Sequence, residues 1–243
     1  MGNESSGQII VGSSALDQST HNMKLIALAM HEFAASTDPN RYPPAAIRQD
    51  GQPLLSWRVV ILPFLGHKDL YDQFHLDEPW DNAHNAALLN QMPEVYAPVI
   101  RTNEPVGATH YQVFTGPGAP FEDELGPKLM DITDGTFNTI LFVESGRAVP
   151  WTKPEDIPFD NDKPVPRLGR WFDLGFHVVF CDGSIHFLSN RANPEIFRHL
   201  ITGNDGMVIN CDDLLRAGFR KSWNYRGLKL FKPGMSAADH GPD

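Results

Sequence analysis

An Asp-Gly pair separates two runs of mainly apolar residues in the C-terminal third of the chain. The runs cover residues 176–181 and 184–188, with Asp182 and Gly183 between them. Asp-Gly supplies the two positive φ angles of a type I′ turn, which joins neighbouring antiparallel strands through a two-residue loop. The sequence therefore predicts a β-hairpin in which the residues on either side of the pair lie directly opposite each other.

The predicted register places alternate residues of this hairpin on opposite faces. The residues expected on the core-facing side are Phe176, Val178, Phe180, Ile185 and Phe187. The other face is expected to carry His177, Val179, Cys181, Ser184 and His186. His177 and His186 would form a diagonal pair with Cβ atoms roughly 7 Å apart, and could share a metal ion if other ligands joined them. Half-exposed histidines without a ligand are the alternative.

An earlier segment has the periodicity of an amphipathic helix. Apolar residues recur at helical spacing at Met23, Ile26, Ala27, Met30 and Phe33. This spacing predicts a helix over residues 19–35, with Ser19 or Thr20 as its N-cap. Residues 1–18 contain no lysine or arginine and only a short apolar run, which is too short for a signal peptide or a membrane span. We expect them to be a disordered leader or a cloning remnant.

Further short elements are predicted along the chain. Ser56 is expected to cap a buried helix over residues 57–62, preceded by a loop that extends to Gln52. Helices are also expected at residues 68–74, 82–92 and 194–201, and strands at residues 110–114 and 139–144. The predicted fold class is therefore α+β, with an amphipathic N-terminal helix packed on an antiparallel β-sheet and long irregular loops. The domain is expected to cover residues 19–207.

The charge of the chain argues against a nucleic-acid partner. Lysine and arginine total 20 and aspartate and glutamate 30, so the net charge is −10. Residues 208–243 form a C-terminal extension of different character, because six basic residues, four aromatic residues and no acidic residue lie between Leu214 and Lys232. Such a strip can bind phosphate or anionic lipid, or can dock on the acidic remainder of the chain, which we favour. Cys181 and Cys211 could form one disulfide in an oxidising compartment.

One segment gathers several potential ligands for a metal. These are His75, Asp77, Asp81 and His84. Their nitrogen and oxygen donors suit zinc or a harder divalent ion, although their spacing matches no standard site. In the alternative interpretation, Asp81 caps a helix that begins near Asn82, and Trp80 packs into the core. Residues 131–136 likewise resemble either the start of a calcium loop or a simple turn.

Aromatic residues offer a second kind of site. Trp80, Trp151 and Trp171 lie near aspartate or asparagine residues or in irregular segments, and could stack on a sugar ring, although tryptophan is more often a core residue. The chain contains no Gly-x-Ser-x-Gly elbow, Walker loop, Gly-x-Gly-x-x-Gly or His-Glu-x-x-His motif. We therefore name no catalytic residue and predict no cofactor, with a divalent metal as the one candidate.

Several segments, in order over about residues 21–203, resemble the large planctomycete group of pilin-like proteins known as domain of unknown function family 1559. The similar segments are residues 21–31, 42–45, 56–59, 62–65, 70–74, 77–81, 132–140, 149–156 and 180–184. The resemblance implies a pilin-like fold, with a long N-terminal helix on an antiparallel sheet, and a cell-envelope setting. The chain lacks the prepilin signal of the family. Phe172 stands where the family has a histidine that is separated from Asp-Gly by nine residues.

The leading hypothesis from the sequence is a non-enzymatic, pseudopilin-type domain of the cell envelope that acts through interaction. Its partner would be a protein, a surface polymer or a second copy of the chain, with no nucleic acid and no membrane span. A ligand-, glycan- or metal-binding module is the alternative, and an uncharacterised hydrolase is a second one.

Overall fold

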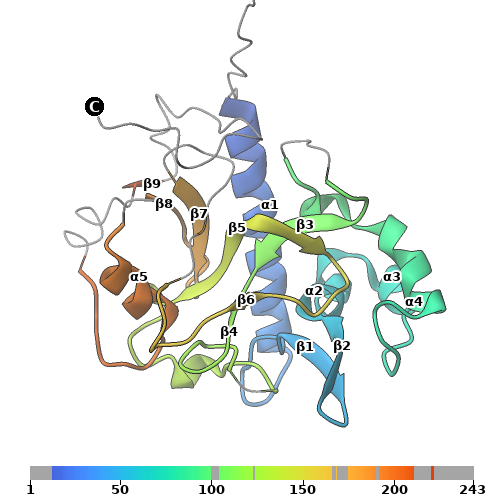
Figure 1. Cartoon of the computed structure of the whole chain (residues 1–243), viewed down its shortest axis with the longest axis horizontal. Coiled ribbons are helices and arrows are strands. Elements are labelled where there is room, and N and C mark those ends of the chain that lie inside the picture. The colour runs from blue at the N-terminus through green and yellow to red at the C-terminus, as the bar shows by residue number, and fades with distance from the viewer. Residues whose placement is uncertain are drawn as a thin grey trace, which may run out of the picture.

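The computed structural model describes residues 13–99, 104–122, 124–165, 168, 175–189, 192–210 and 220–221. Its centre is a five-stranded antiparallel sheet with the strand order β3-β5-β7-β8-β9 (Figure 1). The strands are β3 (Ala108–Gln112), β5 (Ile140–Pro150), β7 (Gly175–Phe180), β8 (Ile185–Ser189) and β9 (Arg220–Lys221). Together with the helices below, this sheet confirms the predicted α+β class. β9 belongs to the basic strip at residues 214–232, the rest of which lies outside the described residues.

Helix α1 (Ser13–Ala35) is longer than predicted. Met23, Ile26 and Met30 are fully buried, which confirms the face that its periodicity predicted. The predicted start at residue 19 was wrong, because the helix begins six residues earlier. Ser19 is therefore an interior residue of the helix, and its hydroxyl bonds to the sheet instead of capping a helix end.

Several short helices follow α1 along the chain. They are α2 (Trp57–Val60), η1 (Leu62–Leu65), α3 (Lys68–Tyr71), α4 (Ala83–Leu88), η2 (Leu89–Gln91), η3 (Glu94–Tyr96) and η4 (Leu129–Asp131). Ser56 caps α2 as predicted, since its side chain accepts a hydrogen bond from the Arg58 amide. Asp81 was the wrong choice of cap for α4, because Asn82 accepts the bond from the Asn85 amide.

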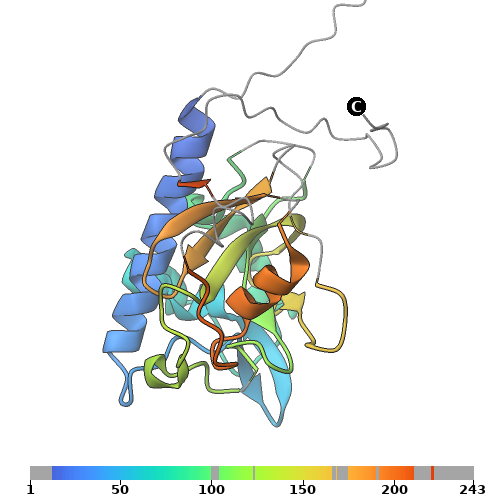
Figure 2. The same ribbon diagram turned by 90° about the vertical axis from the view of Figure 1, so that its left-hand side faces the viewer.

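The sheet lies between α1 on one side and α5 (Pro194–Ile201) on the other (Figure 2). One buried cluster includes Met23, Ile26 and Met30 of α1 together with Val179 and Ile185 of the sheet. A second cluster includes Phe197 and Leu200 of α5 together with Val178 and Phe180. Alternate residues of β7 enter different clusters, so all six residues of this strand are buried.

The hairpin β7–β8 is present, but its register differs by one residue from the predicted one. Val178 lies opposite His186, which places these two side chains on one face and His177 on the other. The loop has three residues, since the Phe180 amide donates to the Ser184 carbonyl. Of the described residues 181–183, only Gly183 has a positive φ, of 80°, whereas a type I′ turn needs two. The predicted pairing of His177 and His186 on one face was therefore wrong.

Replacing Gly183 with valine should lower the free energy of unfolding by about 1–3 kcal/mol. A Cβ atom at this position would lie 3.6 Å from the nearest side-chain atom, so the cost comes from the left-handed backbone and not from a clash. Gly183→Asn is the matched control, because asparagine tolerates this conformation better than valine. Urea unfolding of the two variants would test this, and equal losses would contradict the backbone explanation.

The described residues also form two small two-stranded sheets. The hairpin of β1 (Ala46–Gln49) and β2 (Gln52–Ser56) replaces part of the loop that the sequence predicts up to residue 52. A parallel pair joins β4 (Phe114–Thr115) to β6 (Ile157–Pro158). These four short strands build the site described next. Among the described residues, no helix is both long enough and apolar enough to cross a membrane.

Candidate functional site

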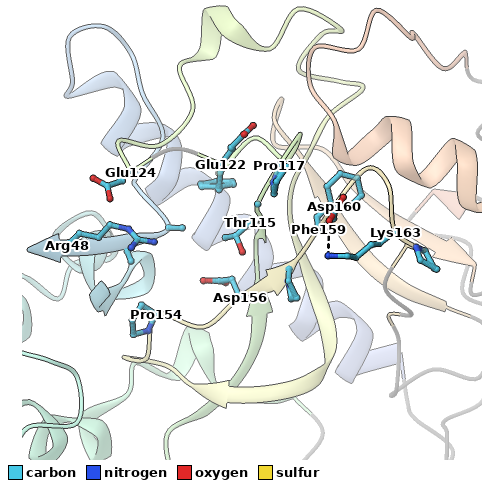
Figure 3. A pocket seen from close by; sticks show the side chains of 16 residues that line it. Arg48, Thr115, Pro117, Glu122, Glu124, Pro154, Asp156, Phe159, Asp160 and Lys163 are labelled. Carbon is cyan, nitrogen blue, oxygen red and sulfur yellow. Dashed lines mark ion pairs between the residues drawn. The ribbon is translucent and has the colours of Figure 1, made fainter. Parts of the chain in front are cut away.

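A cavity of about 760 Å³ lies between the β1–β2 hairpin and the β4–β6 pair (Figure 3). Arg48 of β1 and Thr115 of β4 line it, together with Asp156, which directly precedes β6. Further lining side chains come from the segment after β4 and from the end of β6 and the loop after it: Pro117, Phe121, Glu122, Glu124, Pro158, Phe159, Asp160, Lys163 and Pro164. We identify this cavity as the candidate functional site.

The carboxylate of Asp156 is held by three donors on one of its oxygens. Oδ1 accepts hydrogen bonds from the Val113 amide at 3.0 Å, the Trp57 indole Nε1 at 3.1 Å and the Arg58 guanidinium at 2.9 Å. The Asp156 side chain is only 2 % exposed. Among the described residues, no donor bonds to Oδ2, the second oxygen of a carboxylate that lines the cavity. Oδ2 is therefore a fixed acceptor that is open to the cavity.

Arg58, which is buried beneath the cavity lining, fixes the position of this carboxylate. Its guanidinium is fully buried and also donates to the carbonyl oxygens of Tyr111 at 2.9 Å and Glu155 at 3.3 Å. Burial lowers the pKa of Arg58, and the neighbouring Asp156 opposes that effect. The sequence contained a signal for this residue, because an arginine stands inside the short apolar helix that was expected to be buried. Its partner lies 98 positions further along the chain.

Asp156 should titrate near pH 6. Burial raises the pKa of its carboxyl group to about 6, although Arg58 and the hydrogen bonds from Val113 and Trp57 lower it. An unfolded aspartate has a pKa near 3.9, so the proton binds more tightly to the folded protein. The part of the folding stability that is linked to this proton is therefore complete below about pH 4 and is lost as the pH rises through 6, while the contacts of the ionised carboxylate with Arg58 remain. Carboxyl ¹³C NMR measures the midpoint of the Asp156 titration. Asp156→Asn is the control, because it identifies the signal and removes the pH dependence from unfolding measurements. A midpoint below pH 4 would contradict the prediction.

The charges around the cavity do not balance. Lys163 pairs with Asp160 at 2.8 Å, and Asp156 pairs with the buried Arg58. The other charged side chains among the described lining residues are Arg48, Glu122 and Glu124. One negative charge is thus in excess at the rim, where Glu122 and Glu124 are both exposed.

A second polar group lies buried between α1 and the sheet. Oε2 of Glu144 accepts a hydrogen bond from Ser19 Oγ at 3.1 Å and lies 3.2 Å from His177 Nδ1. Tyr111 is part of the same group, and burial and then the nearby Glu144 raise the pKa of its hydroxyl. The side chains of His177 and Glu144 are 0 % and 5 % exposed, so we interpret this group as a buried polar network that joins α1 to the sheet. His186, on the other face, lies 3.2 Å from Ser184 Oγ.

The predicted metal ligands near α4 are only partly brought together. The rings of His75 and His84 stack with their centroids 3.7 Å apart, whereas Asp77 and Asp81 are exposed to solvent. His75 Nδ1 lies 3.1 Å from Glu78, and His84 Nε2 lies 2.7 Å from the Gln73 carbonyl oxygen. In the described parts of the chain, no three His, Cys, Asp or Glu side chains are arranged to hold a metal ion.

Of the three tryptophans in the predicted aromatic site, the structure describes Trp80 and Trp151. Trp151 is fully buried, its ring stacks on Tyr96, and its indole donates to the Leu89 carbonyl. Trp80 is partly buried, with the ammonium of Lys153 5.5 Å from its ring centre. Trp171 lies outside the described residues.

Residues 131–136 form a structural turn around Asp134. Its two carboxylate oxygens accept hydrogen bonds from the Asp205 and Gly206 amides, each at 2.9 Å. Asn138 holds the same segment, since its amide group bonds to the Met207 carbonyl. The two side chains thereby fasten the chain that follows α5 to the turn before β5. Cys181 is a free thiol buried beside α1, and burial raises its pKa, whereas Cys211 lies outside the described residues.

Comparison with known proteins identifies one family. Residues 17–117 match the family model described as Protein of unknown function (DUF1559), which is the family that the sequence resembles. The matched region includes Arg58 and Thr115 and ends before Asp156. No curated protein and no solved structure matches the chain.

Proposed function

We propose, for a chain that carries a DUF1559 segment over residues 17–117, that the domain is a non-enzymatic, pilin-like interaction domain of the cell envelope. It holds its partner at the cavity between the β1–β2 hairpin and the β4–β6 pair. The envelope setting and the pilin-like character come from the family resemblance. The long helix α1 on an antiparallel sheet supports the same interpretation.

The observation that carries the proposal is the fixed carboxylate of Asp156, which lines an open cavity. Ligand sites commonly combine apolar walls with a few fixed polar groups. The Glu144 and His177 pair has the composition of a catalytic group, but its two side chains are buried between α1 and the sheet and bond to each other. A ligand could reach the open cavity but not the buried pair, so we favour binding at the cavity over catalysis by Glu144 and His177.

Site-specific photo-crosslinking tests the proposal in cells that express the protein. A benzophenone side chain would replace Glu122 or Pro158 at the cavity, and Asp72 near α3 as the control; all three positions are exposed. We expect a discrete product in the envelope fraction from the two cavity positions, containing a second polypeptide. Absence of such a product, or the same products from position 72, would overturn the proposal.

A further inference from the structure

We infer that the cavity receives the ammonium group of a lysine side chain, presented by the partner polypeptide. This inference rests on the proposed function and specifies the chemistry of the same site. It follows from three properties of the described lining residues: the acceptor at the floor, the charge at the rim and the apolar walls.

The floor of the cavity presents hydrogen-bond acceptors. Oδ1 of Asp156 already accepts three hydrogen bonds, and no donor among the described residues bonds to Oδ2. Thr115 lies beside this carboxylate in the cavity, and its hydroxyl oxygen adds a second acceptor (Figure 3). A cationic ligand that donates to Oδ2 makes a charge-assisted hydrogen bond, which is stronger than a hydrogen bond between neutral groups.

The charge favours a cationic donor over a neutral one. After the Asp160–Lys163 and Asp156–Arg58 pairs are counted, Glu122 and Glu124 face a single unpaired cation, Arg48, among the described lining residues. Carboxylates at a cavity mouth attract a positive group and repel an anionic one. A partner that carries one positive charge would balance the described lining.

The geometry favours an ammonium over a guanidinium. A guanidinium binds best to both oxygens of a carboxylate, whereas an ammonium acts as a compact point charge. At Asp156 only one of the two oxygens is available, because the fixed donors occupy the other. Pro117, Pro154 and Phe159 line the walls, where the methylene stem of a lysine side chain could pack.

Matched peptides test this chemistry on the intact chain. The probes are acetyl-Gly-X-Gly-amide peptides in which X is lysine, arginine, norleucine or Nε-acetyl-lysine. Binding is followed by ¹⁵N NMR of the Trp57 indole and the Val113 amide, which both donate to Asp156. We expect the lysine peptide to shift these signals and to bind at least about tenfold more tightly than the two neutral peptides.

Variants distinguish the cavity from the overall negative charge. Glu122→Gln with Glu124→Gln should weaken lysine-peptide binding several-fold, whereas Glu32→Gln on the exposed side of α1 should leave it unchanged. Asp156→Asn should abolish the preference for lysine over norleucine, and its retained Trp57 indole signal would show that it is folded. If Asp156→Asn does not fold, the two rim substitutions still decide the question.

The inference is overturned if norleucine or acetyl-lysine peptides bind as tightly as lysine, or if arginine binds more tightly. It is also overturned if Glu32→Gln weakens binding as much as the rim variants do. These outcomes differ from failure of the proposed function, because crosslinking from positions 122 and 158 would still capture a partner.

Discussion

Replacing Asp156 with alanine should lower the free energy of unfolding by about 3–5 kcal/mol. The substitution leaves the fully buried guanidinium of Arg58 without its counter-charge. It also removes the acceptor of the Trp57 indole and the Val113 amide. Removing one partner of a buried ion pair is strongly destabilising, because the desolvated charge that remains has lost its compensation.

Urea unfolding followed by tryptophan fluorescence measures this loss. Asp160→Ala is the matched control: it removes an aspartate of the same cavity whose partner, Lys163, is largely exposed, and should change stability by less than about 1 kcal/mol. The double variant Arg58→Met with Asp156→Ala should recover part of the loss, because it removes both buried charges. Equal effects of Asp156→Ala and Asp160→Ala would show that the buried pair does not stabilise the fold.

Replacing Asp134 with alanine should also destabilise the protein, by about 3 kcal/mol or more. Asp134 is 3 % exposed, and its two oxygens accept the amides of Asp205 and Gly206. Both hydrogen bonds involve a carboxylate, and each of these is worth about 1.5–3 kcal/mol. Without them the segment after α5 loses an attachment to the turn before β5.

Thermal unfolding and proteolysis together test this effect. The variant should have a lower melting temperature and should be cleaved faster between residues 203 and 209. Thr133→Ala is the control, because this neighbouring side chain is exposed. A melting temperature that falls only on calcium removal, with no effect of Asp134→Ala in calcium-free buffer, would instead support the calcium-loop interpretation.

Local sequence signals predicted several elements correctly. The Ser56 cap, the buried face of α1 and the start of α5 at Pro194 each depend on a few neighbouring residues, whose preferences are visible in the sequence. The beginning of α1 and the short strands β1, β2 and β6 were missed. Neither a capping residue nor an alternating pattern marks them, and they are held by contacts with distant parts of the chain.

The predicted register of the β7–β8 hairpin was wrong for a local reason. The Asp182 side chain accepts a hydrogen bond from the Ser184 amide, an arrangement that aspartate adopts readily in turns. With Asp182 in an ordinary conformation, only Gly183 takes a positive φ and the loop gains a residue. Asp-Gly is compatible with both loop types, so the dipeptide predicted the turn but not its length.

The candidate site could not be predicted because it depends on pairing across the fold. Arg58 was visible as a charged residue in an apolar helix, but nothing in the sequence identified Asp156 as its partner. The predicted histidine pair failed with the register, and His177 instead contacts Glu144, 33 positions earlier. Which carboxylate meets which cation is decided by the packing of α2 against the segment before β6.

The burial of both faces of β7 separates the residues that determine the fold from those that line the cavity. A sheet covered by α1 on one side and α5 on the other must conserve the size and shape of nearly every side chain in its central strand. The loops after β4 and β6 carry no such requirement, yet they supply much of the cavity lining. Substitutions in these loops can therefore change the shape and charge of the cavity, while the packing that defines the fold stays the same.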